Sequence, residues 1–461
     1  MSPKTENVLF ISNRGETLPV VHALRQEGVT TNIYIHDPVA RKAYSGIMPR
    51  LDLNDLEEAI GACTHVNIDI ILRNSKSDED LAFLRKFKLP DDSPGLFGRF
   101  GDMLKKPPYS KEVTGGGAKP EIAELDRDEG FKLARQVGFD IPPYKEFNSL
   151  AAGAKFLYSD EGKKGLWVFK PSGNQDLDLT LVETYKGELL DLLMTTIPQR
   201  FDGNDQVNFI IQKKIDGKTV ELSSEIWRNA AGKFLHPNRT FENKKLGSGD
   251  TGPAVGSQSN TVFLDKAPGV IHRLIMAIPW LKDYVGSVDA NVIIDYLGRI
   301  WFLEWTFRFG YSALYLLLTL VPKGKLWRFF LRDFEVKLNN LWVASQTLTL
   351  HPFPHVRDSR RSRQMVKDNL INNPLDAKGA WWLDVYRDRN DKLRCAGGDG
   401  LLGVIVGTGE NAESAIKAAH ANLQAILKGG VTGDVQYRTE QDHLEKHLER
   451  LQRLDSWKVD Y

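Results

Sequence analysis

The segment ENKKLGSGDTGP, which runs from Glu242 to Pro253, combines three glycines and one proline with charged residues of both signs. It is too polar for a hydrophobic core and too rich in glycine for a helix. A flexible linker has no need for such a mixture of charges. The composition therefore predicts a loop that holds a ligand, and other segments of the chain indicate what that ligand is.

The composition of the whole chain is that of an ordinary globular protein. Its 461 residues are enough for two to four domains, with 41% hydrophobic residues and a net charge of +1. This charge gives no reason to expect a nucleic acid or a membrane as partner. Cys63 and Cys395 are the two cysteines, which is typical of a reducing compartment. We expect a cytoplasmic protein, a monomer or small homo-oligomer, that acts on small molecules.

No segment of the sequence has the pattern of a signal peptide or a membrane span. The N-terminus lacks a basic region followed by a long apolar core. The most apolar run, Tyr311–Val321, has eleven residues, whereas a span needs roughly 20. We therefore predict a buried helix there.

Two short apolar segments near the N-terminus, Asn7–Asn13 and Thr31–Asp37, are predicted strands, and the segment between them has helical spacing up to Gly28. This order is typical of a βαβ unit in a parallel sheet. Val66–Leu72 is a third predicted strand. Ligands of such sheets bind at the carboxyl ends of the strands, so Ser12–Glu16 is a candidate site, with an ordinary strand-to-helix turn as the alternative.

The central part of the chain favours antiparallel pairs. Leu166–Asn174 and Leu179–Glu183 are predicted to form one hairpin, and Ser287–Gly310 another. Gln206–Gly217 and Lys218–Trp227 are predicted to pair as well. Residues from about 90 to 120, rich in proline, glycine and lysine, are predicted to be a linker or mobile loop.

Charged residues on the Ser287–Gly310 hairpin suggest a metal site. Asp289 and Glu304 lie on opposite arms and can approach each other across the pair. Two neighbouring carboxylates repel unless a cation shares them, and oxygen ligands suit Mg²⁺. Arg308 follows closely, where it would stabilise a phosphoryl group. The alternative is a pair of solvent-facing charges, but the apolar surroundings of Glu304 in WFLEW make an unpartnered carboxylate costly.

Lys170 ends another apolar strand, in WVFKPSG. It would hold the α- and β-phosphates of a nucleotide, with a lysine that extends into solvent as the alternative. Together with the glycine loop and the carboxylate hairpin, this lysine suggests ATP bound between two sheets.

Four motifs make the chain resemble the ATP-grasp ligases and, among them, the phosphoribosylamine–glycine ligase (glycinamide ribonucleotide synthetase) family. NKKLGSGDTGP, at Asn243–Pro253, is similar to a lysine-rich turn followed by G-D-x-D-T-G-P. FLEWTFRFG, at Phe302–Gly310, is similar to V-x-E-F-N-x-R-F-G. IIQKKIDGK, at Ile210–Lys218, stands where the family has E-E-F-L-D-G, and Leu401–Ile426 is similar to the family's final strand and helix. The resemblance covers nearly the whole chain.

The resemblance implies a multidomain protein of α/β and α+β class. An N-terminal parallel α/β layer (residues 1–120) would precede a central ATP-grasp domain with antiparallel sheets (121–340), in which residues from about 145 to 220 cover ATP. A small α+β cap (341–435) and a helical tail (436–461) would follow.

The activity implied by the resemblance is an ATP- and Mg²⁺-dependent (or Mn²⁺-dependent) ligation. A carboxylate attacks the γ-phosphate of ATP, an acyl phosphate forms, and an amine displaces phosphate to give an amide, so that the protein mainly positions groups and stabilises charge. Glycine and phosphoribosylamine would be the substrates, as in purine biosynthesis. The implied catalytic residues are Arg308, Lys245 and Asp250, and the implied metal ligands are Asp289, Glu304 and, weakly, Thr306. The implied ATP contacts are Lys170, Gly173, Gln212, Lys213, Ile215, Glu221 and Arg127. The implied substrate contacts are Lys244, Thr251, Gly252, Gly15 and Asn13.

Several positions depart from the family pattern. Thr306 replaces the asparagine that follows the metal-binding glutamate, and Gly173 alone remains of the glycine-rich phosphate loop. The segments at Ser12–Glu16 and Ala254–Asn260, which belong to substrate recognition in the family, also differ. Two alternatives therefore stay open: a ligase of the same fold for another amino acid and amine acceptor, and a nucleotide-binding homologue that has lost catalysis.

Overall fold

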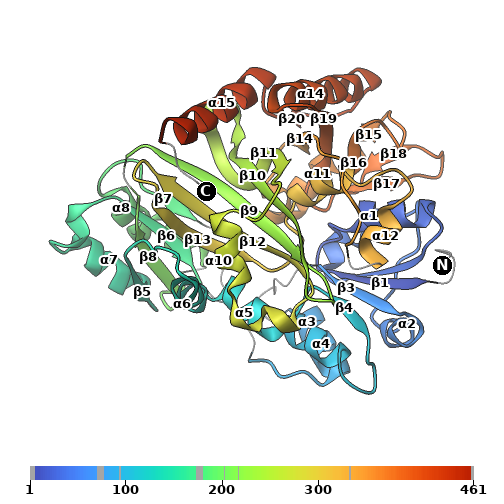
Figure 1. Ribbon diagram of the computed structural model, residues 1–461, viewed down its shortest axis with the longest axis horizontal. Coiled ribbons are helices and arrows are strands. Elements are labelled where there is room, and N and C mark those ends of the chain that lie inside the picture. Colours follow the sequence, from blue (N-terminus) through green and yellow to red (C-terminus); the bar gives the residue numbers. More distant parts are fainter. Residues whose placement is uncertain are drawn as a thin grey trace.

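The computed structural model describes residues 6–69, 77–92, 95–172, 180–201, 203–215, 217–331 and 334–457. Gly173, predicted to contact phosphate, and residues 70–72 of the third predicted strand lie outside these ranges. The chain forms a mixed α/β structure with one parallel sheet and several antiparallel ones (Figure 1). No helix in the described part of the chain is long and apolar enough to cross a membrane.

The N-terminal layer is a parallel four-stranded sheet in the order β2-β1-β3-β4. The predicted βαβ unit is confirmed, because β1 pairs in parallel with β2 and α1 connects them. The strands are β1 (Asn7–Ser12), β2 (Thr30–Ile35), β3 (His65–Ile68) and β4 (Glu112–Thr114). The helices are α1 (Leu18–Gln26), α2 (Leu56–Ala62), α3 (Asp78–Phe87), α4 (Gly98–Leu104) and α5 (Ala118–Leu125).

The predicted linker between residues 90 and 120 is wrong for most of its length. It contains α4 and β4, and the buried side chains of Phe97, Phe100 and Leu104 pack into the core of the N-terminal layer. The glycine and proline content misled the prediction, because Gly98 and Gly101 are small enough to let α4 pack closely. A Cβ on Gly98 would lie 2.7 Å from the Glu121 side chain.

A second four-stranded sheet, in the order β5-β8-β6-β7, lies at the opposite side of the molecule with α7, α8 and α9 (Figure 1). The predicted hairpin at Lys170 is confirmed by the antiparallel pairing of β6 and β7. The strands are β5 (Tyr144–Phe147), β6 (Trp167–Pro171), β7 (Leu181–Val182) and β8 (Phe209–Lys213). The preceding and covering helices are α6 (Arg127–Val137), α7 (Leu150–Tyr158), α8 (Glu188–Met194) and α9 (Thr196–Arg200).

The largest sheet among the described residues has nine strands, and we call it the large sheet. Its order is β13-β12-β9-β10-β11-β14-β19-β16, and β20 pairs with β14. The predicted hairpin Ser287–Gly310 is confirmed as β12 and β13. The strands are β9 (Thr219–Arg228), β10 (Phe234–Gly247), β11 (Thr251–Leu264), β12 (Gly286–Asp295), β13 (Ile300–Thr306), β14 (Trp342–Leu350), β16 (Ala380–Trp382), β19 (Leu401–Gly409) and β20 (Val435–Gln436).

The predicted pairing of Gln206–Gly217 with Lys218–Trp227 is wrong. These segments form β8 and β9, which belong to different sheets: β8 pairs with β5 and β6, and β9 pairs with β10 and β12. The turn at Gly217 therefore passes the chain from the second sheet to the large sheet.

The C-terminal part of the chain continues the large sheet. β14 pairs with β11 on one side and β19 on the other, so the predicted boundary at residue 341 falls within one continuous sheet. A small separate sheet has the order β15-β18-β17. Its strands are β15 (Leu370–Ile371), β17 (Val385–Arg387) and β18 (Leu393–Cys395). The remaining helices are α10 (Val270–Met276), α11 (Ala313–Thr319), α12 (Leu326–Leu331), α13 (Arg360–Val366), α14 (Ala412–Gly429) and α15 (Glu440–Trp457).

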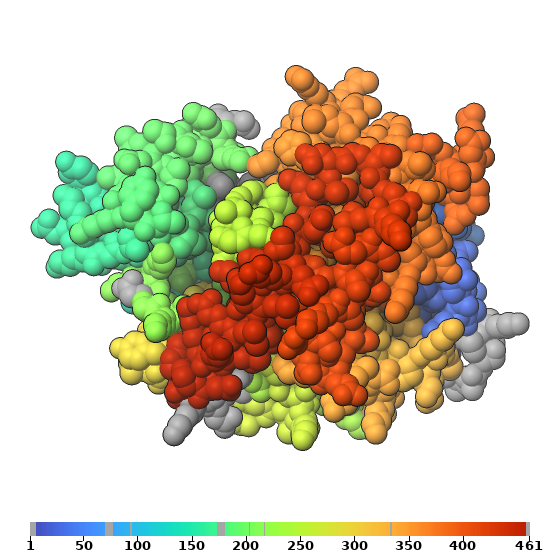
Figure 2. All heavy atoms as spheres, turned by 90° about the horizontal axis from the view of Figure 1, so that it is seen from above, coloured from blue at the N-terminus to red at the C-terminus, as the bar shows by residue number. Residues whose placement is uncertain are grey.

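Two long C-terminal helices, α14 and α15, lie across one side of the large sheet. Figure 2 shows this C-terminal segment spread over the surface of the molecule. Apolar side chains on the underside of the sheet, among them Leu222, Phe241 and Val292, share one core with α6, α10 and Leu454 of α15. The opposite side of β9, β10, β12 and β13 is polar, and it holds most of the predicted site.

Candidate functional site

The register of the large sheet places the predicted metal ligands on one face. Asp289 lies opposite Thr306 on one side and Glu225 on the other, and Asn291 lies opposite Glu304. Directly opposed residues project to the same face of an antiparallel pair. Alternation along each strand completes this face, which we call the polar face. Its members include Glu221, Ser223, Glu225, Asn238, Thr240, Glu242, Lys244, Asp289, Asn291, Glu304 and Thr306.

Lys244 lies at the centre of the carboxylates on the polar face. Its Nζ lies 2.7 Å from Glu221, 3.8 Å from Glu304 and 3.9 Å from Glu242. Although burial favours the neutral amine, these three carboxylates raise the pKa of Lys244. Lys244 therefore carries a fixed positive charge, with its side chain 30% exposed.

Arg127 and Lys170 approach the same group from the second sheet. Arg127 opens α6, and its Nη1 donates to Glu304 Oε2 at 2.9 Å. Burial, and then the charge of Arg127, lower the pKa of the nearby Lys170 to about 8. Although burial favours the protonated acid, Lys244, Arg127 and Lys170 hold the pKa of Glu304 below its usual range. Lys170, Arg127 and Lys244, which were predicted to contact ATP or substrate, therefore lie around Glu304, which was predicted to bind the metal.

Carboxylates outnumber cations on the polar face. Burial raises the pKa of Glu242 to about 7, and the neighbouring Glu221 and Glu304 charges add to this. Burial and the charges of Glu225 and Glu242 raise the pKa of Asp289 well above its usual value. The raised pKa values favour the protonated forms of Glu242 and Asp289, and a divalent cation bound beside them would favour their ionised forms.

The protein donors alone do not form a closed metal site. Within the described residues, no group of three or more His, Cys, Asp and Glu side chains is arranged to hold a metal ion. Oxygen donors are nevertheless present, since Asp289 and Glu304 flank Asn291 in the register of β12 and β13. This chemistry fits Mg²⁺, which keeps several waters and binds through one or two carboxylates beside substrate phosphates.

Asn291 is a candidate ligand that the sequence reasoning missed. Its side chain is 4% exposed, and its Oδ1 is buried without a hydrogen-bond partner among the described residues. Its Nδ2 donates to Ser223 Oγ at 3.3 Å, which orients the amide. A buried amide oxygen without a partner is costly. The sequence could have predicted this position, because Asn291 follows Asp289 by two residues in a strand and therefore lies on the same face.

Arg308 is held in place by Glu124 of α5, another residue that the sequence reasoning missed. Arg308 Nε donates to Glu124 Oε1 at 2.7 Å, and the Phe307 N–H donates to Glu124 Oε2 at 2.9 Å. Although burial favours the neutral form, Glu124 raises the pKa of Arg308. The guanidinium is therefore charged and oriented, with 22% of the side chain exposed.

The N-terminal loop joins this region through Asp69, which follows β3. Asp69 accepts hydrogen bonds from Ser12 Oγ at 2.7 Å and from Tyr311 OH. Burial and the charge of Glu16 raise the pKa of Asp69 to about 7, opposed in part by Arg308. Tyr311 follows Arg308 closely in the chain, so the N-terminal layer and the end of β13 meet here.

Asn13 and Gly15, the predicted substrate contacts, lie in the same loop. Asn13 is fully buried, and both its Nδ2 and its Oδ1 lack a partner within the described structure. Gly15 has φ +83°, and a Cβ there would lie 2.7 Å from Leu18. The turn therefore requires glycine and leaves an amide beside it whose hydrogen-bonding groups are unused.

The predicted contacts to adenine lie on and after β8. Gln212 is 2% exposed, and its Oε1 lacks a partner in the described chain. The N–H of Lys213 donates to Pro143 and that of Lys214 to Leu166, so both are used within the protein. Ile215 follows them. Glu221, predicted to reach ribose, is instead 2.7 Å from Lys244 in this structure.

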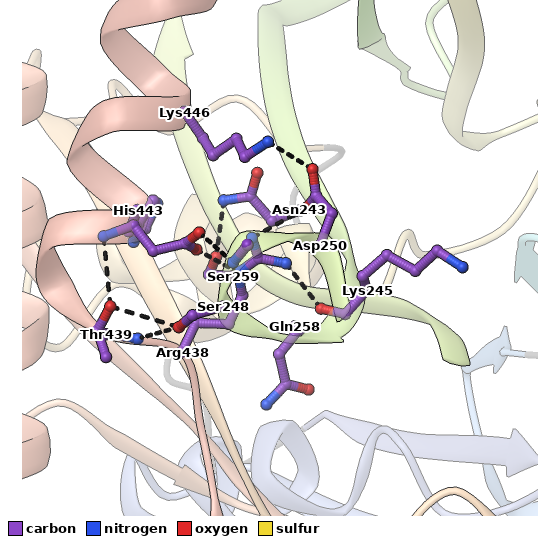
Figure 3. Close-up of polar contacts among 12 residues, drawn as sticks. Asn243, Lys245, Ser248, Asp250, Gln258, Ser259, Arg438, Thr439, His443 and Lys446 are labelled. Atoms are coloured by element: carbon purple, nitrogen blue, oxygen red, sulfur yellow. Dashed lines mark hydrogen bonds and ion pairs between the residues drawn. The ribbon is translucent and has the colours of Figure 1, made fainter. Parts of the chain in front are cut away.

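The tip of the Glu242–Pro253 segment points away from the polar face. Lys245 follows Lys244 in β10 at a place where the pairing with β11 is irregular, its side chain is exposed, and Figure 3 shows it extended away from α15. Asp250 binds Arg438 and Lys446, at 3.0 Å and 2.5 Å. Thr251 and Gly252 are exposed. The structure thus brings Lys244 into the carboxylate group and leaves the other predicted loop contacts outside it.

Comparison with known proteins supports the fold and leaves the activity open. No family model matches the chain, and no curated protein matches its sequence. Phosphoribosylamine–glycine ligase from Thermotoga maritima matches with a TM-score of 0.63 and 16% identity, over 94% of this chain and 99% of that one. Biotin carboxylase from Campylobacter jejuni, in a complex with an ATP analogue, matches with a TM-score of 0.58 and 12% identity, over 95% and 94%.

A third structure shows the same fold with nucleotide and metal bound. It is the biotin carboxylase domain of 2-oxoglutarate carboxylase from Hydrogenobacter thermophilus, in a complex with MgADP and bicarbonate. It matches with a TM-score of 0.58 and 10% identity, over 93% of this chain and 91% of that one. The chain therefore has the ATP-grasp fold that its sequence motifs imply.

Proposed function

We propose that this protein is an ATP-dependent carbon–nitrogen ligase that joins a carboxylate to an amine through an acyl phosphate. The observation that carries the proposal is the convergence of Arg127, Lys170 and Lys244 on Glu304, on a face with excess carboxylates. Such a site fits a triphosphate and a divalent cation together. The shared fold with nucleotide-bound proteins supports this proposal.

In the proposed site, Asp289, Asn291 and Glu304 hold Mg²⁺ or Mn²⁺. The metal ion, when bound, offsets charge on the phosphates and orients the γ-phosphate. Thr306 lies opposite Asp289 and would contribute at most a hydroxyl. The amide of Asn291 takes the role for which the sequence offered only Thr306.

The cations have separate roles in the proposed reaction. Lys170 and Arg127 hold the phosphates, and the backbone after β8, with Ile215, receives the adenine. Lys244 neutralises the approaching carboxylate and keeps Glu221 and Glu242 from repelling it. Arg308, oriented by Glu124, stabilises the acyl phosphate. The protein thus supplies position and charge, and the substrates supply the bonds that change.

For the substrates, we propose glycine and phosphoribosylamine, or a second pair that fits the altered N-terminal loop. The unused amide of Asn13, beside the Gly15 turn, favours an acceptor with hydroxyl groups that both donate and accept hydrogen bonds. An amino sugar phosphate has this chemistry. Another amino acid and acceptor remain the second candidate, because Ser12–Glu16 differs from the family pattern.

The test is ADP release from Mg²⁺-ATP with a panel of amino acids, each with and without phosphoribosylamine. Release with glycine and phosphoribosylamine together would support the first substrate pair, and release with another pair the second. ADP release with no member of the panel, despite nucleotide binding, would contradict the proposal and favour a homologue without catalysis.

A further inference from the structure

Residues 438–446 of the C-terminal segment bind the tip of the Glu242–Pro253 segment, outside the polar face (Figure 3). Arg438, which is fully buried, donates to the Lys245 carbonyl at 2.8 Å and to Asp250 Oδ1 at 3.0 Å. Its Nε donates to Asp442 Oδ2 at 2.6 Å, and Asp442 Oδ1 accepts the Gly249 N–H at 2.7 Å. A buried arginine is costly unless its donors are used. Here it joins three separate segments.

Two further contacts join the C-terminal segment to the tip of the loop. Lys446 Nζ donates to Asp250 Oδ2 at 2.5 Å, so both oxygens of Asp250 are engaged. The Thr439 N–H donates to Ser248 Oγ at 3.0 Å. Although burial favours the protonated acid, Lys446 and Arg438 lower the pKa of Asp250. Asp250 therefore stays ionised and bound to the C-terminal segment.

The loop has a backbone conformation that needs such support. Asp250 has φ +56°, a left-handed conformation that is uncommon outside glycine, and Gly249 and Gly252 have φ of +68° and +76°. Glycine-rich segments of this kind sample many conformations when nothing holds them. Two cations on one carboxylate select a single conformation.

The same helix is also tied to the strands that carry the polar face. Arg450 of α15 donates to the Glu242 carbonyl at 2.8 Å, and Arg453 donates to the Thr219 carbonyl at 3.0 Å. His443, a buried residue of α15, lies with its Nε2 3.0 Å from Thr261 Oγ1 of β11. Helix α15 therefore holds β9, β10 and β11 and the loop between β10 and β11 as one unit.

We propose that Arg438, Asp442 and Lys446 are positioning residues that fix the Ser248–Gly252 loop and, through β10, the place of Lys244. This inference rests on the proposed ligase function. It gives Asp250 a role different from the catalytic one that the resemblance implies: Asp250 is the residue by which the C-terminal segment holds the loop, and it does not contact a substrate. The C-terminal helix is then part of the machinery for ligation.

The test compares Lys446→Ala, Lys446→Arg and Asp250→Asn with the parent protein. The matched control is Lys417→Ala, which removes another lysine–carboxylate pair, with Glu413, on α14. We measure kcat and the KM for ATP by ADP release, and hydrogen exchange of the peptide spanning residues 245–256. The exchange measurement includes the Gly249 amide, which Asp442 protects, and it does not depend on activity.

We expect Lys446→Ala and Asp250→Asn each to lower kcat about tenfold and to speed exchange of the loop, with the KM for ATP within about twofold. Lys446→Arg should restore kcat to within about threefold, and Lys417→Ala should match the parent. A double variant, Lys446→Ala with Asp250→Asn, should be no slower than Asp250→Asn alone, because Asp250→Asn already removes the ion pair with Lys446.

Other results would overturn the inference. If Asp250→Asn lost far more activity than Lys446→Ala while loop exchange stayed unchanged, Asp250 would act on the substrate. If neither variant changed kcat or exchange, α15 would not position the loop. If the parent released no ADP with any substrate pair, the proposed function would fail, and loop exchange would still decide whether Lys446 and Asp250 fix the loop.

Discussion

The two faces of the large sheet use charge in opposite ways. On the polar face, the carboxylates of Glu242 and Asp289 have raised pKa values, and the side-chain oxygen of Asn291 has no partner in the described part of the chain. On the other face, where α15 packs, the ionised groups are matched: Arg438 binds two carboxylates and Asp250 binds two cations.

This difference indicates that the polar face is suited to bind a ligand, whereas the face where α15 packs supports the structure. A face with charges and hydrogen-bonding groups left over is stable only at a cost, and a ligand that supplies the missing charge removes that cost. Where α15 packs, the charges of Arg438, Asp250 and Asp442 are already paired, so a charged ligand would not improve their pairing. The Glu242–Pro253 segment contributes to both regions, because Lys244 lies on the polar face and Asp250 is bound by Lys446 of α15.

The largest effect should come from Glu304, where three cations meet. We expect Glu304→Gln to lower Mg²⁺-dependent ADP release about a thousandfold, because it removes a proposed metal ligand and leaves Arg127 and Lys244 without their carboxylate. The fold should persist, since glutamine keeps the shape of the side chain.

The control for this variant is Glu335→Gln, which removes an exposed carboxylate paired with Lys233. It should leave ADP release unchanged. Turnover of Glu304→Gln close to that of the parent would contradict the metal assignment, and a thermal midpoint far below that of Glu335→Gln would show that the charge serves the fold.

The sequence predicted the elements better than their partners. The hairpin of β12 and β13 was predictable because its turn is local and its two arms are adjacent, which also placed Asp289 and Glu304 on one face. The placement of β8 and β9 in different sheets was not predictable, because nothing in the connection at Gly217 shows that the chain changes sheets. Strands that follow one another in the sequence are adjacent in a sheet in most cases, but not in all.

The site shows the same limit. The resemblance implied that both Lys244 and Lys245 act on the substrates, yet in the structure it is Lys244 that lies among the carboxylates. The partners of Asp250 lie 188 and 196 residues further along the chain, so no local pattern could have named them. Long-range partners of a loop depend on how distant elements pack, and the charge of a residue alone does not reveal them.

A comparison of the two adjacent lysines gives the second prediction. Lys244→Ala should slow ligation about a hundredfold, because Glu221, Glu242 and Glu304 then repel one another and the substrates. Lys245→Ala should change the rate by no more than about twofold, since its side chain is exposed and extends away from α15 and from the carboxylate group. Rates of amide formation for both variants test this, and equal losses would show that the loop closes with both lysines over the substrates.

The third prediction concerns the unused oxygen on the polar face. Asn291→Ala should weaken Mn²⁺ binding about tenfold in the presence of ATP, measured by the electron paramagnetic resonance signal of free Mn²⁺. Asn390→Ala, at an exposed turn, is the control. Unchanged Mn²⁺ affinity in Asn291→Ala would remove Asn291 from the ligand set and leave the two carboxylates as the protein's contribution.

The smallest effect should be the pH dependence of nucleotide binding. Burial and Arg127 lower the pKa of Lys170 to about 8, so its ammonium is present below that pH and is lost above it. The KM for ATP should therefore be constant up to about pH 7 and rise up to about tenfold by pH 9, as the charge that contacts the phosphates disappears. Lys170→Arg keeps its charge over this range and should give a flat profile. A parent profile that is equally flat would mean that bound ATP holds the proton on Lys170, or that Lys170 does not contact the phosphates. Measuring proton uptake on ATP binding at pH 9 separates these two results, because only a lysine beside the phosphates takes up a proton when ATP binds.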